Sequence, residues 1–187
     1  MENEYSEKHF NLSDAEKWLK SENPKERLLG SKLLERLTDG SIFLLSEIPS
    51  DHALVALENI IPFILQTIED LSQKLYFKSD TKKTFFEIEE QILLLLIRAL
   101  GNCLVKDYLQ SEAALRNWIP NCLRVLRGTS NLNLRANCLR TLVNFSTRSL
   151  QQRRDIIASL KLELQDIKSI KLNTMGRTYL KLLVFQV

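Results

Sequence analysis

Asparagine and arginine side chains recur at helical spacing late in this chain, and they are its best candidates for recognition chemistry. Asn133, Asn137, Arg140 and Asn144 are three or four positions apart, so they share one face of a helix. Amide and guanidinium groups bind polar partners through directed hydrogen bonds, and a guanidinium also pairs with carboxylate or phosphate. The spacing therefore predicts a helix with one packed face and one face that is free to bind.

Catalytic chemistry has no comparable support. His9 and His52 are the only histidines, and neither has a serine, cysteine or acidic residue at a spacing typical of a nucleophile and its base. The chain also lacks a phosphate-binding glycine loop and closely spaced zinc ligands. Glu87, Glu89 and Glu90 cluster at a predicted helix start, where the helix dipole favours them. We expect no enzymatic activity, no cofactor and no metal.

Basic residues leave a nucleic-acid-binding function open. Residues 1–105 carry 12 basic and 18 acidic side chains, whereas residues 106–187 carry 14 and 5, so the two parts have balances of −6 and +9. Arg148, Arg153 and Arg154 form a small basic cluster, but no aromatic side chain for base stacking lies between them. The asymmetry is consistent with an anionic partner and equally with an ordinary solvated surface.

Turn and cap residues mark the helices that must position the polar face. Ile119-Pro120 opens a first helix, because proline loses no hydrogen bond in a first helical turn. Gly128 supplies a C-cap, and Asn131 supplies the N-cap of a second helix that ends near Ser146. The predicted apolar stripe of this second helix consists of Leu134, Cys138, Leu142 and Phe145.

The same pattern occurs earlier in the chain. Arg98 and Asn102 precede Arg140 and Asn144 by 42 residues, within the range of about 40–47 residues typical of armadillo and HEAT repeats. The segments RALGN (98–102) and RTLVN (140–144), each preceded by a helix that opens with Ile-Pro, resemble the armadillo repeat. Residues 110–127 are similar to the short first helix of that repeat turning into its second. The resemblance implies an all-α, right-handed solenoid of about four armadillo-like or HEAT-like repeats.

The resemblance also implies a binding groove. In armadillo proteins the third helix of each repeat lines a concave groove, where asparagines bind the backbone of an extended peptide; that role falls here on Asn102 and Asn144. Where peptide-binding members often have tryptophan, this chain has Arg98 and Arg140. Together with Lys32, Arg36, Arg177 and Lys181 they would form a row of cations in the groove. The expected partner is therefore an acidic peptide or a phosphate-bearing partner. The expected partner-binding residues are Arg98, Asn102, Asn137, Arg140, Asn144, Arg177 and Lys181.

The domain organisation follows from the repeats. We expect a flexible acidic tail at residues 1–10 and one repeat domain at residues 11–187, with approximate repeats at 11–40, 52–105, 108–147 and 149–187. Relative to the third repeat, the second contains an insert at about residues 72–87. We predict that this insert lengthens two helices joined by a polar loop, with its aromatic residues packed between the extensions. These aromatic residues are Tyr76, Phe77, Phe85 and Phe86.

Three further boundaries are predicted from local signals. Ser13 and Glu16 match a capping box, and Asn23-Pro24 begins the next helix, which stops at Asp39-Gly40. Ile61-Pro62 is expected to end a short helix and to open a long one. Asn173 or Thr174 caps a last helix, whose apolar end LKLLVFQV should remain partly exposed.

The remaining features concern location and role. The acidic start lacks a signal-peptide pattern, and no apolar run is long enough to span a bilayer, so we expect an intracellular protein without membrane insertion. Cys103, Cys122 and Cys138 fall on apolar faces and are expected to be reduced core residues. The predicted function is a scaffold or adaptor that binds a partner protein. The alternatives are a nucleic-acid-binding repeat protein and a structural subunit that self-associates, or continues, through its C-terminal end.

Overall fold

The computed structural model describes residues 12–39, 50–77, 86–105, 118–146 and 170–185, together with residues 154 and 158. These residues form helices and no strand, which confirms the all-α class for the described part of the chain. The helices are α1 (Leu12–Leu19), α2 (Pro24–Asp39), α4 (Ser50–Phe77), α5 (Phe86–Val105), α7 (Trp118–Gly128), α8 (Leu132–Ser146) and α10 (Thr174–Phe185).

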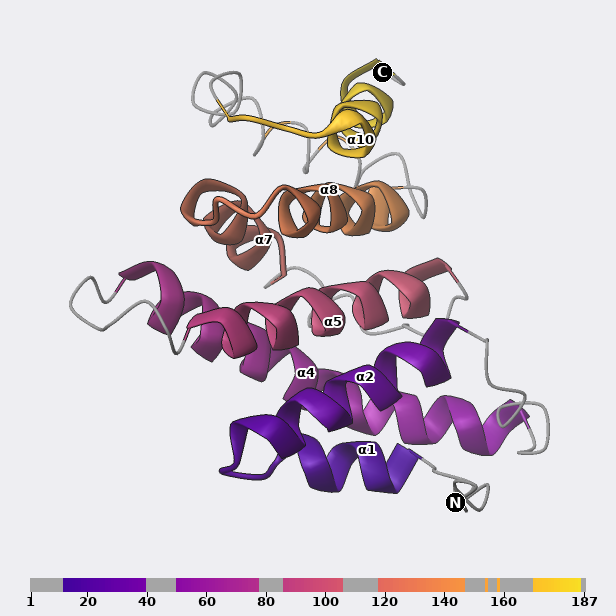
Figure 1. Cartoon of the computed structure of the whole chain (residues 1–187). Coiled ribbons are helices and arrows are strands. Elements are labelled where there is room, and N and C mark those ends of the chain that lie inside the picture. The colour runs from indigo at the N-terminus through magenta and orange to yellow at the C-terminus, as the bar shows by residue number, and fades with distance from the viewer. Residues whose placement is uncertain are drawn as a thin grey trace, which may run out of the picture.

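The helices lie in successive layers that follow the order of the sequence. Figure 1 shows α1 and α2 at one end, then α4 with α5, then α7 with α8, and α10 at the other end. Along one side, α2 packs against α5, α5 against α8, and α8 against α10. On the other side, α4 contacts both α1 and α7. The helices that carry the candidate residues are thus direct neighbours in space.

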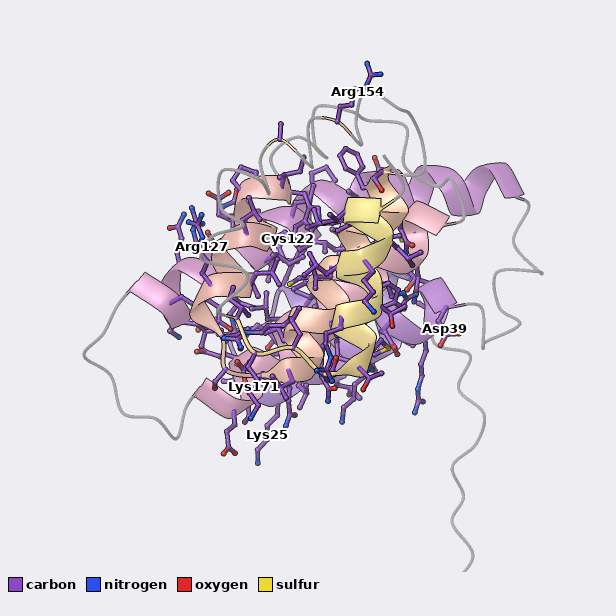
Figure 2. All side chains as sticks on the ribbon, turned by 90° about the horizontal axis from the view of Figure 1, so that it is seen from above. Lys25, Asp39, Cys122, Arg127, Arg154 and Lys171 are labelled. Carbon is purple, nitrogen blue, oxygen red and sulfur yellow. The ribbon has the colours of Figure 1, made fainter. Side chains whose placement is uncertain are left out.

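One apolar core runs through the layers. It includes Leu34 of α2, Ile64 of α4, Leu93 of α5 and Leu142 of α8, all fully buried. The predicted apolar stripe of α8 is confirmed, because Leu134, Cys138, Leu142 and Phe145 are all buried. The three cysteines are also free and buried as predicted. Cys122 lies near the centre of the molecule in Figure 2, and burial raises the pKa of its thiol well above the ordinary value.

Asparagine caps set the starts of three helices, as the sequence predicts. The side-chain oxygen of Asn131 accepts a hydrogen bond from the backbone N–H of Leu134 at 3.2 Å, and α8 begins directly after it. Asn23 accepts from the N–H of Lys25 at 3.0 Å at the start of α2. Asn173 accepts from a first-turn N–H of α10 at 2.8 Å. Each bond satisfies a backbone donor that the helix itself leaves unpaired.

The predicted capping box at the first helix is wrong. The helix α1 begins at Leu12, so Ser13 lies inside it instead of preceding it. The carboxylate of Glu16 lies 2.6 Å from the ammonium of Lys20, one turn further along the helix. This i,i+4 ion pair uses the glutamate that the capping box would have required.

The predicted helix boundary at Pro62 is also wrong. The helix α4 is continuous from Ser50 to Phe77 with Pro62 inside it, and its direction changes along its length (Figure 1). An interior proline costs about 3 kcal/mol. Burial of each large aliphatic side chain contributes about 1.5–3 kcal/mol. Ile60, Ile61 and Ile64 around the proline are all buried, so their packing outweighs its cost.

The insert lengthens two helices as predicted, since α4 extends to Phe77 and α5 begins at Phe86. The polar loop between them lies outside the described residues. Tyr76, however, packs on the next layer and not only between the extensions. A Cβ atom added to Gly128 would lie 2.4 Å from the Tyr76 ring, so the end of α7 needs a glycine for this close approach. The φ of Gly128 is not left-handed, which corrects the expected reason for the glycine at this C-cap.

Some expectations fall on parts of the chain that the structure does not describe. These parts include the tail at residues 1–10 and almost all of the first helices expected for the fourth repeat. At the last helix, the prediction of exposed apolar residues holds for Leu182, which is 37% exposed, whereas Leu183 is buried. Within the described ranges, no helix is long and apolar enough to cross a membrane.

Candidate functional site

The predicted binding residues lie on three of the four helices that pack in succession. Arg98 and Asn102 come from α5, while Arg177 and Lys181 come from α10. The other three, Asn137, Arg140 and Asn144, come from α8. We call the surface formed by Lys32, Arg36, Arg98, Arg140, Arg177 and Lys181 on α2, α5, α8 and α10 the basic face.

The two ends of the stack are aligned along one edge of the molecule. In the view along the stack, Lys25 of α2 and Lys171, which precedes α10, project at the same edge (Figure 2). Both are exposed. The layers therefore place cations from distant parts of the sequence on a common side.

Hydrogen bonds between neighbouring helices use the amides that the sequence offers for binding. Asn102 accepts from the guanidinium of Arg140 at 2.6 Å and donates to the Thr38 hydroxyl at 3.5 Å. Asn144 donates to the backbone carbonyl of Gly101 at 3.1 Å. These bonds connect α2, α5 and α8, and we call them the inner ladder. Because Asn102 is only 8% exposed, its amide bonds mainly to neighbouring helices and is poorly accessible to a ligand.

Asn137 does not lie on a free face, which corrects the predicted polar stripe. It is 3% exposed, and its amide donates to the backbone carbonyl of Asn133 at 2.9 Å. The neighbouring Thr141 is also buried and bonds to the carbonyl of Ile97 on α5 at 3.3 Å. Since α8 has α5 on one side and α10 on the other, this part of the stripe is covered.

The cations of the middle helices are only partly available. Arg98 lies 3.8 Å from the carboxylate of Glu35 on α2, and its side chain is 37% exposed. Arg140 is half-buried beside Asn102. An ion pair with this exposure contributes at most about 1 kcal/mol, so an acidic ligand can compete for Arg98.

The cations of the end helices are open to solvent. Lys32 and Arg36 on α2 are exposed, and so are Arg177 and Lys181 on α10. These side chains can reach a ligand without breaking the inner ladder. The structure therefore brings all the predicted cations onto helices that pack in sequence, but it leaves the outer four most accessible.

The sequence did not reveal the role of Glu90. Its carboxylate accepts hydrogen bonds from the Thr129 hydroxyl, from the Asn131 amide at 3.3 Å and from the Tyr76 hydroxyl at 3.3 Å. Glu90 thus joins α4 and α5 to the turn that precedes α8, where the helix dipole favours a negative charge. Burial raises the pKa of Tyr76, so its phenol remains a neutral donor. No local sequence signal identifies such a contact, because its partners are distant in the chain.

No group of three or more histidine, cysteine, aspartate or glutamate side chains suited to a metal ion occurs in the described ranges. Comparison with known proteins gave no match: no family model matches the chain, and no curated protein or solved structure is similar to it.

Proposed function

We propose that the chain is an armadillo-like α-solenoid scaffold that binds an acidic segment of a partner protein at the basic face. The observation that carries this proposal is the placement of exposed Lys32, Arg36, Arg177 and Lys181 on helices of one packed row. Carboxylates of an extended segment that crosses these helices would meet one or more cations on each.

In this proposal, ion pairs with the ligand contribute more to binding than hydrogen bonds to its peptide backbone. Asn102 and Asn144 already bond to neighbouring helices, so a peptide backbone would have to displace those bonds. The four exposed cations need no such rearrangement, whereas Arg98 would leave Glu35 and Arg140 would leave Asn102. The partner is therefore expected to be rich in aspartate, glutamate or phosphorylated side chains.

The test uses a fluorescently labelled ten-residue polyglutamate peptide and measures anisotropy. Lys181→Glu should weaken binding by about five-fold, the effect of roughly 1 kcal/mol at an exposed charge. Lys17→Glu is the matched control, because Lys17 is exposed on α1, outside the basic face. Equal affinities of the two variants would reject the basic face as the binding site.

A labelled single-stranded DNA of twelve nucleotides tests the alternative function in the same assay. Phosphate contacts release counterions, so affinity for nucleic acid falls steeply with salt. Tighter binding of the DNA than of the peptide at physiological salt would favour a nucleic-acid-binding protein. Preference for the peptide would support the protein scaffold.

A further inference from the structure

A crevice opens between the turn that joins α1 to α2 and the middle of α4. Its volume is about 380 Å³, within the range of about 300–1,000 Å³ typical of small-ligand sites. Leu19, Phe63 and Leu71 provide apolar walls. Its charged lining consists of Lys20, Glu22, Arg27, Asp70, Lys74 and Glu89, which balance to zero net charge. The crevice is separate from the basic face and from the inner ladder.

Glu89 and Arg27 leave two buried polar atoms unsatisfied at this crevice. Glu89 is 5% exposed, and its Oε1 pairs with the Lys74 ammonium and lies 3.9 Å from Nη2 of Arg27. Its other oxygen, Oε2, has no hydrogen-bond partner in the described part of the chain, and neither has Nε of Arg27. Native proteins pair nearly all buried polar atoms. The orphan acceptor and the orphan donor belong to two residues that line the same crevice, so they are candidate contacts for one ligand group.

We infer that the crevice binds a carboxamide group, which donates its N–H to Oε2 of Glu89 and accepts at its carbonyl from Nε of Arg27. A carboxamide carries a donor and an acceptor on neighbouring atoms, so one group satisfies both orphans. It is also neutral, which matches the balanced charge of the lining. An ammonium or guanidinium would meet Arg27 and Lys74, and a carboxylate or phosphate would meet Glu89 and Asp70.

Entry of the ligand requires a side chain to move. Both orphan atoms are closed to solvent, and Lys74, whose side chain is 56% exposed, covers Glu89. Rotation of Lys74 toward solvent opens the carboxylate but breaks its ion pair with Glu89, so the ligand N–H and the nearby charge of Arg27 must offset the loss. The Lys20 ammonium lies 5.4 Å from the centroid of the Phe63 ring. The body of the ligand would pack beside Phe63 and Leu71, which form apolar walls of the crevice.

The carboxamide group could come from two sources: a small aromatic amide, or a glutamine or asparagine side chain of a partner protein. Titration of the ¹⁵N-labelled full chain with benzamide and with N-acetylglutamine methylamide, followed by NMR, distinguishes them by relative affinity. Acetophenone is the isosteric comparison for benzamide, because it keeps the carbonyl and lacks the N–H. Benzamide should bind about ten-fold more tightly than acetophenone, the effect of one lost buried hydrogen bond.

Arg27→Lys removes Nε–H and keeps the positive charge, so it should weaken benzamide binding by about ten-fold. Arg127→Lys is the matched control, because Arg127 is exposed on α7 and belongs neither to the crevice nor to the basic face; it should have no effect. Circular dichroism and thermal melting establish that both variants fold. The comparison of benzamide with acetophenone on the unaltered chain does not depend on any variant.

Three results would overturn the proposal. The first is equal affinity for benzamide and acetophenone, and the second is a saturable shift confined to residues outside the crevice. The third is no binding of either amide up to its solubility limit, which would leave a bridging water as the partner of the two orphan atoms.

Discussion

The inner helices α5 and α8 and the end helices α2 and α10 use similar residues for different purposes. Asn102 and Arg140 bond to each other across the α5–α8 contact. Arg177 and Lys181 on α10 have the same four-residue spacing as Arg140 and Asn144 on α8, yet both are exposed. The type and spacing of a polar side chain therefore do not fix what it does.

Burial between neighbouring helices explains why the inner polar side chains bond within the protein. The helix α8 packs against α5 on one side and α10 on the other, so its polar side chains lose water and must find partners in the protein. On α2 and α10, cations remain hydrated and available. Inner polar residues thus hold the layers together, while the outer cations Lys32, Arg36, Arg177 and Lys181 stay exposed. Four predictions test this comparison.

The largest expected effect is that of a core truncation in an inner helix. Leu142 of α8 is fully buried, so Leu142→Ala should reduce the free energy of unfolding by about 2–5 kcal/mol through an unfilled cavity. Leu182→Ala on α10 should change it by less than about 0.5 kcal/mol, because Leu182 is 37% exposed. Urea denaturation measures both. Similar losses would contradict the contrast between inner and end helices.

The next prediction concerns two glycines. A Cβ atom on Gly101 of α5 would lie 3.0 Å from the Thr141 hydroxyl, which is held by bonds to the carbonyls of Ile97 and Asn137. Gly101→Ala should therefore destabilise by about 1–3 kcal/mol. Gly176→Ala on α10 should be neutral or stabilise by up to about 1 kcal/mol, because the nearest atoms are side-chain atoms at 3.3 Å and alanine favours helix. Thermal melting of both variants measures this difference in stability.

Removal of an inner amide should have an intermediate effect. Asn102→Ala removes the acceptor of the Arg140 guanidinium and the link to the Thr38 hydroxyl, at a cost of about 1–2 kcal/mol. The matched control is Asn133→Ala, because Asn133 is exposed and its contact with Asn173 is long, 3.4 Å. Chemical denaturation should show a loss for the first variant alone. A stable Asn102→Ala that still lost peptide binding would return this asparagine to the ligand site.

The smallest expected effect is the coupling between Arg98 and Glu35. A double-mutant cycle with Arg98→Ala and Glu35→Ala should give less than about 1 kcal/mol, because the pair is long and partly exposed. The coupling should decrease further as salt screens the charges. Arg98→Ala should weaken peptide binding more than Glu35→Ala does, because loss of Glu35 leaves the arginine free for the ligand. The opposite order would show that Arg98 does not contact the ligand.

Local chemistry in the sequence predicted much of the fold. The asparagine caps of α2, α8 and α10 follow from contacts within a few residues. The apolar stripe of α8 follows from helical periodicity. These features depend on short-range hydrogen bonds and on burial of one face, so the neighbouring sequence contains the necessary information.

The placement of the candidate site depended on contacts between residues that are far apart in the sequence. The sequence placed Asn102, Asn137 and Asn144 on a binding stripe, but it did not show that neighbouring helices take up their hydrogen bonds. It also predicted a break at Pro62 that packing of the surrounding isoleucines overrides. In each case a tertiary contact outweighed a local preference.

By itself, the sequence determined that the described chain is helical, where most of its helices start and stop, and which cations fall on related helix positions. Only the tertiary structure decided which of those polar residues stay exposed. It alone brought Glu90 to Thr129 across 39 residues and placed Glu89, Lys74 and Arg27 around one crevice. Caps and stripes arise from interactions within one helix, whereas exposure and cavities arise from how separate helices pack, which no local pattern contains.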